Sequence, residues 1–238
     1  MYKRQVLDAL VRNRLANNTL ILCTTDHGIA FPGMKCNLTD HGLGVMLILR
    51  GPGGFSGGKV IDAMVSHLDL FPTLCELLEI DPPPWLQGRS LLSLLKGQAG
   101  QVNDEIFAEV NYHAAYEPMR AVRTARYKYI RRFSERSTPV LPNCDDSPAK
   151  SLWLNHGWRE RPSPAEELFA LIFDPFEAHN LANTPDYEPV LIELRARLER
   201  WMRETADPLL TGPVIAPAGA ILNDPGGLSP EEPTFVVA

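Results

Sequence analysis

The stretch Leu20-Ile-Leu-Cys-Thr-Thr-Asp-His-Gly-Ile-Ala-Phe-Pro-Gly-Met-Lys35 decides the fold. Its first residues form an unbroken apolar, β-prone run that passes through two threonines and stops at Asp26-His27-Gly28. This is the pattern of a fully buried strand followed by a turn. Because ligands of open α/β sheets bind beyond the carboxyl ends of the strands, Asp26 and His27 are predicted to reach a metal ion or an anion.

The segments on either side of this strand indicate an α/β domain. Residues 3–16 carry apolar side chains on one face, which predicts an amphipathic helix packed on a sheet. Residues 45–49 form a second continuous apolar strand, and Asp69 is predicted to cap the helix that follows it. We therefore expect part of a parallel sheet with flanking helices. Since no strand precedes the first helix, we also expect the true N-terminus, and half of this domain, to be missing.

The second half of the chain has a different pattern. Short alternating runs at residues 106–110, 121–124, 127–131 and 167–173 predict strands, and residues 187–204 carry a clean apolar helical stripe. We expect a small antiparallel sheet covered by this helix, with residues 134–165 as a long polar loop. The predicted domains are residues 1–100, the end of an α/β catalytic domain; 101–208, an α+β subdomain; and 209–238, a Pro/Gly-rich tail.

Composition excludes several classes of partner. The 238 residues are 45% hydrophobic and carry a formal net charge of −6, so nothing favours binding to nucleic acid or to an acidic membrane surface. No apolar stretch approaches the roughly 18–20 residues of a membrane helix. The four cysteines share no metal-ligand spacing. The sequence gives no localisation.

Four residues are candidates for chemistry. Asp26 and His27 offer the oxygen and nitrogen ligands of a divalent metal, or else a turn cap and a hydrogen-bonded loop histidine. Lys35, in a Gly/Pro loop, can neutralise an anionic substrate, or is an ordinary solvated lysine. His113 follows a strand and precedes a loop, and is either a substrate contact or acid, or a structural histidine. Asp40 and His41 are weaker candidates.

Basic residues of the predicted hairpin could attract a polyanionic sugar. Such alternating charges more often form the solvent-facing side of a strand pair. The residues are Arg120, Arg123, Arg126, Lys128, Arg131 and Arg132.

Several motifs, in a fixed order, resemble the C-terminal half of the sulfatases of the alkaline phosphatase superfamily. They are Thr25-Asp-His-Gly28, Ile48-Leu-Arg-Gly-Pro-Gly53, Ser66-His-Leu-Asp-Leu-Phe-Pro-Thr73 and Glu167-Leu-Phe-Ala-Leu-Ile-Phe-Asp-Pro-Phe-Glu-Ala-His-Asn-Leu-Ala182. Phe31-Pro32 with Lys35, Pro118–Arg123, and Trp201 with Glu204–Pro208 resemble the heparan N-sulfatase (N-sulfoglucosamine sulfohydrolase) branch. The resemblance covers about residues 1–208.

This resemblance implies a hydrolase of sulfate esters or sulfamates that acts on sulfated sugars with a divalent metal, commonly Ca, with Mn, Mg or Zn as alternatives. It makes Asp26 and His27 metal ligands, Lys35 the cation that contacts sulfate and, more loosely, His113 a catalytic residue. Related enzymes are often lysosomal, periplasmic or secreted.

Three features depart from the family pattern. No cysteine or serine begins the Cys/Ser-x-Pro-x-Arg motif that yields the formylglycine nucleophile, and the pair of N-terminal metal-binding aspartates is missing. His27 also stands where many sulfatases have Asn, which leaves open a phosphonate monoester or phosphodiester hydrolase. We therefore expect a fragment that is inactive by itself and whose partner is the missing N-terminal half, or a catalytically dead truncated chain.

Overall fold

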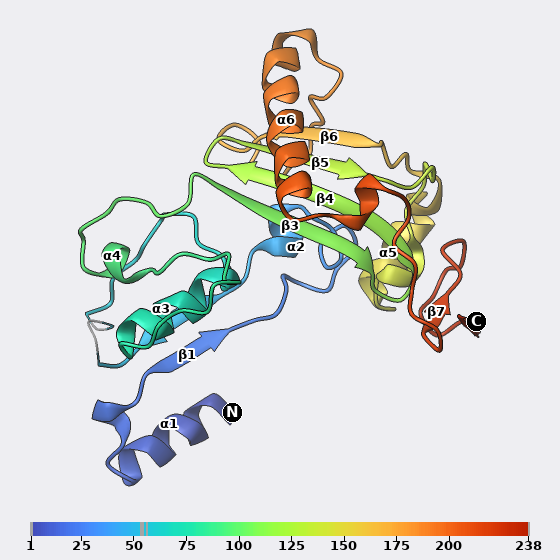
Figure 1. Cartoon of the computed structure of the whole chain (residues 1–238). Helices are drawn as coiled ribbons and strands as arrows, with labels where there is room; N and C mark the ends of the chain where they lie inside the picture. The colour runs from blue at the N-terminus through green and yellow to red at the C-terminus, as the bar shows by residue number, and fades with distance from the viewer. Residues whose placement is uncertain (1, 53–54, 56, 238) are drawn as a thin grey trace. The chain divides into compact units, whose positions relative to one another are not determined.

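The computed structural model describes residues 2–52, 55 and 57–237 (Figure 1). The chain divides into two compact units. The first comprises residues 1–26 and 45–106, and the second comprises residues 27–44 and 107–238. Gly53, the last residue of one of the motifs above, lies outside the described residues. The predicted domain limits near residues 100 and 208 stay predictions.

The first unit contains a helix and a two-stranded sheet. Helix α1 (Tyr2–Arg12) leads through a short 3-10 turn to β1 (Ile21–Thr24), which pairs with β2 (Leu47–Arg50). The helix and both strands are present and the α/β fold class is confirmed. However, α1 ends at Arg12 and has no buried residue, so the expected packing of this helix on a sheet is not observed. The expected parallel pairing is wrong for these two strands, because the chain between them contains no crossover helix and β2 runs back antiparallel to β1. Both strands alternate between half-buried and exposed residues, so β1 is not the fully buried strand that we expected.

A second group of elements in this unit is organised around a buried carboxylate. Asp69 ends the 3-10 turn His67–Asp69, directly before α3 (Leu70–Leu77), and is 1% exposed. Its oxygens accept hydrogen bonds from the backbone of Ser66 and Arg89 and from the Asn103 amide, each at 2.8 Å. Three donors satisfy the buried charge, so Asp69 is structural. The predicted cap of α3 is wrong, because the Asp69 side chain makes no cap hydrogen bond to that helix and instead completes the capping box that begins at Ser66. Helix α4 (Leu92–Leu95) follows.

The second unit is built on a four-stranded sheet with the strand order β3-β4-β5-β6. The strands are β3 (Glu105–Tyr112), β4 (Tyr116–Thr124), β5 (Tyr127–Arg132) and β6 (Glu166–Ala170), and β5 pairs antiparallel with both β4 and β6. Helix α6 (Glu188–Glu204) lies across one face (Figure 1). Its apolar stripe packs on the sheet through Leu191, Leu194, Leu198 and Met202. The predicted antiparallel sheet, its hairpin and its covering helix are confirmed.

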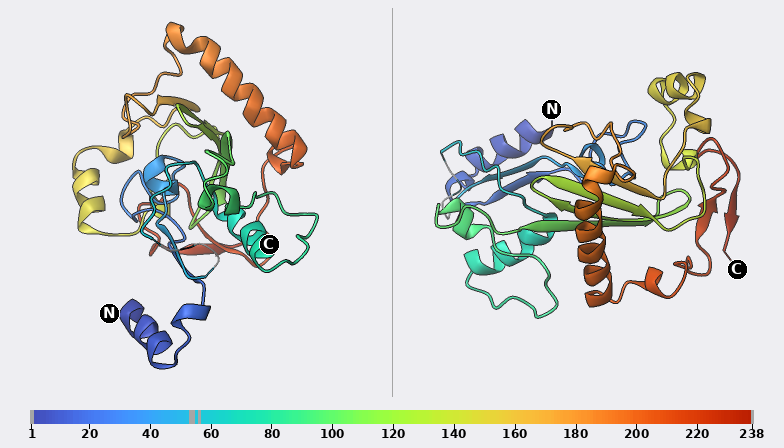
Figure 2. Two further views of the ribbon diagram at one scale, coloured as in Figure 1. Left: turned by 90° about the vertical axis from the view of Figure 1, so that its left-hand side faces the viewer. Right: turned by 90° about the horizontal axis from the view of Figure 1, so that it is seen from above.

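The opposite face of this sheet is covered by the segment of residues 27–44, which contains α2 (Asp40–Leu43) (Figure 2). Leu38 is the buried apolar anchor of this segment, and it packs with Met119, Ala121, Ile130 and Phe169 of the sheet. The segment that carries His27 and Lys35 therefore packs into the core of the second unit and is not a loop that projects from it.

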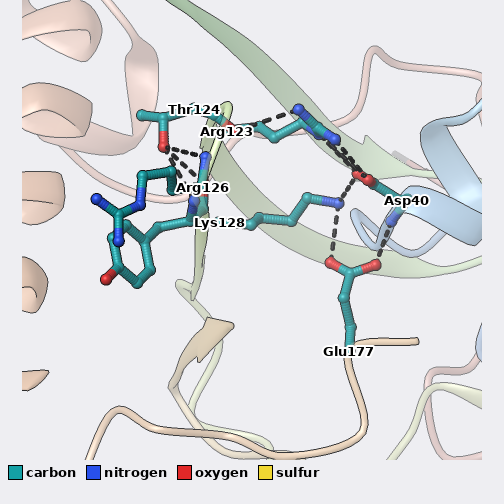
Figure 3. A network of polar contacts seen from close by, with 7 residues as sticks. Asp40, Arg123, Thr124, Arg126, Lys128 and Glu177 are labelled. Atoms are coloured by element: carbon teal, nitrogen blue, oxygen red, sulfur yellow. Dashed lines mark hydrogen bonds and ion pairs between the residues drawn. The ribbon is translucent and has the colours of Figure 1, made fainter. Parts of the chain in front are cut away.

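Two of the basic hairpin residues do not face solvent, which corrects the prediction of a solvated face. Arg120 and Lys128 are both fully buried. The Arg120 guanidinium pairs with Asp207, which follows α6. Lys128 points to the other face, where it pairs with Asp40 and Glu177 (Figure 3). A charge on a strand can face the core when a distant segment supplies its counter-ion.

Several elements arise in segments predicted to be irregular. The polar loop contains α5 (Pro148–Asn155), whose N-cap Ser147 accepts a hydrogen bond from the Lys150 backbone, and the tail contains a hairpin of β7 (Ile221–Asn223) and β8 (Thr234–Val236). Further 3-10 turns span Ala16–Asn18, Leu141–Asn143, Trp158–Glu160, Pro185–Tyr187 and Pro208–Leu210. Within the described residues, no helix is both long and apolar enough to cross a bilayer.

Candidate functional site

Asp26 lies in the first unit, directly beyond the end of β1. The strand end that precedes it is fixed by side chains: Thr24 Oγ1 lies 2.8 Å from His67 Nε2, and Thr25 Oγ1 accepts a hydrogen bond from the Met46 backbone at 3.3 Å. Asp26 itself is exposed. The predicted position of a carboxylate beyond a strand end is thus confirmed, while its role as a ligand stays a prediction.

His27 begins the segment that covers the sheet of the second unit. Its Nδ1 lies 2.6 Å from the Gly28 carbonyl oxygen. A carbonyl oxygen only accepts, so Nδ1 carries the proton and Nε2 holds the lone pair that a metal would need. The Gly28 backbone donates to Gly42, and a Cβ atom at residue 28 would stand 1.9 Å from the His41 carbonyl oxygen. Only glycine fits there, and this close approach fixes the backbone that presents the imidazole.

Lys35 is not a solvated lysine. Its side chain is 15% exposed, and its Nζ donates to both oxygens of Asp145, at 2.9 and 3.2 Å. The Lys35 backbone is tied to Ile29, and Cys36 after it has a φ of 63°, which turns the chain away sharply. Burial raises the pKa of the Cys36 thiol to about 11, so this cysteine is protonated at neutral pH.

His113 follows β3 directly, as predicted, at the turn that leads into β4. Partial burial and the positive charge of Lys35 lower its pKa, and the negative charge of Asp145 opposes them. His27 also acts on this pKa. The imidazole is therefore neutral at neutral pH. His27, Lys35 and Asp145 all act electrostatically on His113, and Lys35 is hydrogen-bonded to Asp145. We call these four residues of the second unit the candidate site.

Asp145 is the member of the candidate site that the sequence did not predict. It lies in the segment predicted as a featureless polar loop, 110 residues from its partner Lys35. No periodic pattern surrounds it, and an acidic residue before a helix is usually read as a cap. Only the folded chain shows that this carboxylate faces a candidate sulfate-contacting cation.

The donors present suit a divalent cation in kind but do not complete a site. Asp26 and His27 supply a hard oxygen and an imidazole nitrogen. Across the part of the chain that the structure describes, no three His, Cys, Asp or Glu side chains gather as a ligand set. Two adjacent residues can thus hold a metal only together with further ligands.

The weaker candidate Asp40 serves the fold instead. Burial works to raise the pKa of its carboxyl, but hydrogen bonds from Arg123 and Lys128 outweigh this and hold it below its ordinary value. The Asp40 backbone donates to Glu177 at 2.5 Å, so four residues close one network (Figure 3). His41 stacks on Phe176 with a ring separation of 5.8 Å. Asp40 thus anchors α2 to strands β4 and β5, and His41 packs α2 on the turn after β6 that carries Phe176.

Comparisons with known proteins point to one family. Residues 34–151 match the family model described as N-sulphoglucosamine sulphohydrolase, C-terminal, a span that includes Lys35, His113 and Asp145. An ulvan-active sulfatase of Formosa agariphila is 32% identical over 88% of this chain and 43% of its own length. The human N-sulphoglucosamine sulphohydrolase is 29% identical over 87% of this chain and 46% of its own.

A solved structure gives the same result for the fold. A 2-O GAG sulfatase superposes with a TM-score of 0.67 at 28% identity, over 89% of this chain and 42% of that one. The architecture is therefore that of hydrolases with the alkaline-phosphatase-like fold. Within that class the chain belongs to the sulfatase family, as a C-terminal portion. It spans less than half the length of these relatives.

Proposed function

We propose that this chain is the C-terminal part of a metal-dependent sulfatase that hydrolyses a sulfuric ester or a sulfamate on a sulfated sugar. The observation that carries the proposal is the candidate site, in which a largely buried ammonium and two imidazoles converge within one unit. Relatives named as acting on ulvan, on N-sulphoglucosamine and on a 2-O-sulfated glycosaminoglycan support the substrate class.

Each residue has a role that its chemistry suits. Lys35 neutralises the charge that collects on the sulfuryl oxygens as the S–O or S–N bond breaks. The imidazole of His113 is neutral at neutral pH, so its ring N–H donates a hydrogen bond to the substrate and the ring does not act as a charged acid. Asp26 and the Nε2 atom of His27 would hold the divalent cation, most often Ca in such enzymes, with Mn, Mg or Zn as alternatives. When bound, that cation polarises the sulfate oxygens.

The nucleophile and the remaining metal ligands would come from an N-terminal half of the same domain. The surface of the first unit supports this part of the proposal. Tyr2, Val6, Val11 and Leu15 of its N-terminal segment are more than half exposed, and Ile48 of β2 is 54% exposed. Large apolar side chains that stay exposed along one helix favour a contact with another segment or protein. The unpaired edges of a two-stranded sheet point the same way.

The proposed function is tested on the intact protein that includes the N-terminal half. An aryl sulfate, a sulfamate and a phosphodiester are assayed side by side, before and after chelation with EDTA. Turnover of a sulfate or sulfamate that chelation abolishes is the expected result. Preference for the phosphodiester would instead indicate a phosphodiester or phosphonate hydrolase. No turnover of any substrate would indicate a dead truncated chain.

The metal ligand is tested separately. Asp26→Ala should abolish turnover of the intact enzyme, whereas Asp186→Ala, at the surface turn before α6, should leave it unchanged. Unchanged activity of Asp26→Ala would remove this residue from the site.

The proposed half-domain is tested on the 238-residue chain, which should aggregate at low micromolar concentration. A monomer with one cooperative melt would refute it.

A further inference from the structure

We propose that Asp145 is a positioning residue: it holds the Lys35 ammonium in place, and the segment Leu141–Asp146 is fastened on both sides so that Asp145 keeps its position. The proposal rests on the proposed function of Lys35 and extends it to residues that no sequence motif marks. An ordinary ion pair between two surface loops would need neither fastening nor burial, and such pairs stabilise a protein little.

The contact between the two side chains restrains a flexible group. A lysine side chain has four rotatable bonds, and its ammonium can satisfy an anion from many positions. In this unit the Lys35 Nζ donates to both oxygens of one carboxylate while only 15% of its side chain is exposed. The buried carbon chain of Lys35 and the two hydrogen bonds of its ammonium to Asp145 together restrict the ammonium to one position. Because 48% of the Asp145 side chain is exposed, the pair borders solvent, where an anion can approach.

Lys150 fastens the segment on its C-terminal side. This lysine is 2% exposed, although lysines are almost never fully buried without partners. Its ammonium donates at 2.7 Å to the Cys144 carbonyl oxygen and at 2.7 Å to Asp146 Oδ1. These are the two residues that flank Asp145. One buried cation thus holds the residue on each side of Asp145, through the backbone of Cys144 and the side chain of Asp146.

Asn143 fastens the same segment on its N-terminal side. Its side chain is buried, and its Oδ1 accepts a hydrogen bond from the Ala115 backbone at 2.8 Å. Its amide donates to Glu117 at 2.9 Å. Ala115 closes the turn that begins at His113. The segment therefore sets the position of the ammonium relative to the imidazole, which an isolated ion pair would not do.

The experiment compares Asp145→Asn with a charge-matched control, Glu135→Gln, on an exposed residue outside the candidate site. In the intact enzyme, Asp145→Asn should lower kcat/KM for an aryl sulfate by about 10- to 100-fold, the usual cost of displacing a catalytic group by about 1 Å. Asp145→Glu should recover part of the loss. Glu135→Gln should match the wild type.

A second readout does not depend on activity. Cys36 directly follows Lys35 and is half-buried, so its alkylation by iodoacetamide reports how firmly this part of the segment is held. In the intact protein, Asp145→Asn should speed the alkylation of Cys36 several-fold, measured by mass spectrometry, and Glu135→Gln should not.

The outcomes separate this inference from the proposed function. Wild-type kinetics in Asp145→Asn overturns the inference, whether or not alkylation is faster, because Asp145 then does not serve the site. If the wild-type intact protein hydrolyses no sulfate, the proposed function is refuted instead. In that case the alkylation rate decides by itself whether Asp145 holds Lys35: a faster rate supports it and an unchanged rate overturns it.

Discussion

Replacing Asp207 by Asn should destabilise the second unit strongly. The Arg120 and Asp207 side chains are 0% and 2% exposed, and they meet through two hydrogen bonds, Nε to Oδ2 at 2.5 Å and Nη2 to Oδ1 at 3.0 Å. Asn at this position keeps the shape but removes the charge. The guanidinium would then stay buried without its main counter-ion.

The size of the effect follows from the burial of both partners. Removing one partner of a buried ion pair costs about 3–5 kcal/mol. Asn retains one acceptor oxygen, and the Glu109 carboxylate lies 3.4 Å from Arg120 Nε, so we expect the lower end of that range. For a protein of this size about 1 kcal/mol shifts Tm by about 2–4 °C, which gives a fall of about 6–12 °C.

The assay is thermal and urea denaturation at pH 7, followed by circular dichroism. Glu199→Gln is the matched control, because its pair with Arg203 at 3.6 Å is well exposed at both ends and should be worth less than about 1 kcal/mol. The double replacement Arg120→Met with Asp207→Leu should recover much of the loss, since no charge is then left buried. A loss in Asp207→Asn no larger than that in Glu199→Gln would refute the reasoning.

Three further predictions concern titrating groups of the second unit. The pKa of Asp40 is lowered in the folded chain, so it stabilises the fold above the ordinary value of 3.8 and this contribution is lost as the pH falls. The stability deficit of Asp40→Asn should therefore shrink below about pH 4, and a constant deficit in acid denaturation would contradict this. Because the Cys36 pKa is about 11, its alkylation at pH 8 should be about 100-fold slower than that of an unperturbed thiol; an ordinary rate would show that burial does not protect it. Lys35→Met should raise the pKa of His113, and Asp145→Asn should lower it, as followed by NMR of the imidazole protons; shifts of the opposite sign would remove these residues from one site.

The elements that the sequence predicted are those with a local signal. The apolar stripe of α6 and the alternating runs of β4 and β5 repeat within a few residues, so the pattern does not depend on the rest of the fold. Asp69 was recognised as structural from its place before an apolar helix, although two of its three partners, Arg89 and Asn103, lie 20 and 34 residues away. Asp26 and His27 were located by the end of an apolar run, which is again a local feature.

The elements that the sequence missed depend on distant parts of the chain. Arg120 and Lys128 read as solvent-facing because their counter-ions, Asp207 and Asp40, lie 87 and 88 residues away. The antiparallel pairing of β1 and β2 depends on how a long connection returns, which no strand pattern encodes. Helix α5 could have been predicted from the sequence, since Ser147-Pro148 is a good N-cap and first-turn signal.

The buried charges explain why the second unit can hold a site at all. The segment of residues 27–44 has only one short helix, and among its described residues only Pro32, Leu38 and Gly42 are buried. Apolar contacts of this extent would let such a loop move.

Asp40 adds three hydrogen-bonded partners, and two of them, Lys128 and Glu177, are themselves fully buried side chains (Figure 3). Opening the loop would leave Lys128 and Glu177 without Asp40 in a dry interior, which costs far more than the loss of a surface contact. The sheet therefore acts through its buried charges as the platform that keeps His27 and Lys35 in position, and the positions of these two residues should loosen together whenever Lys128 is replaced by Met.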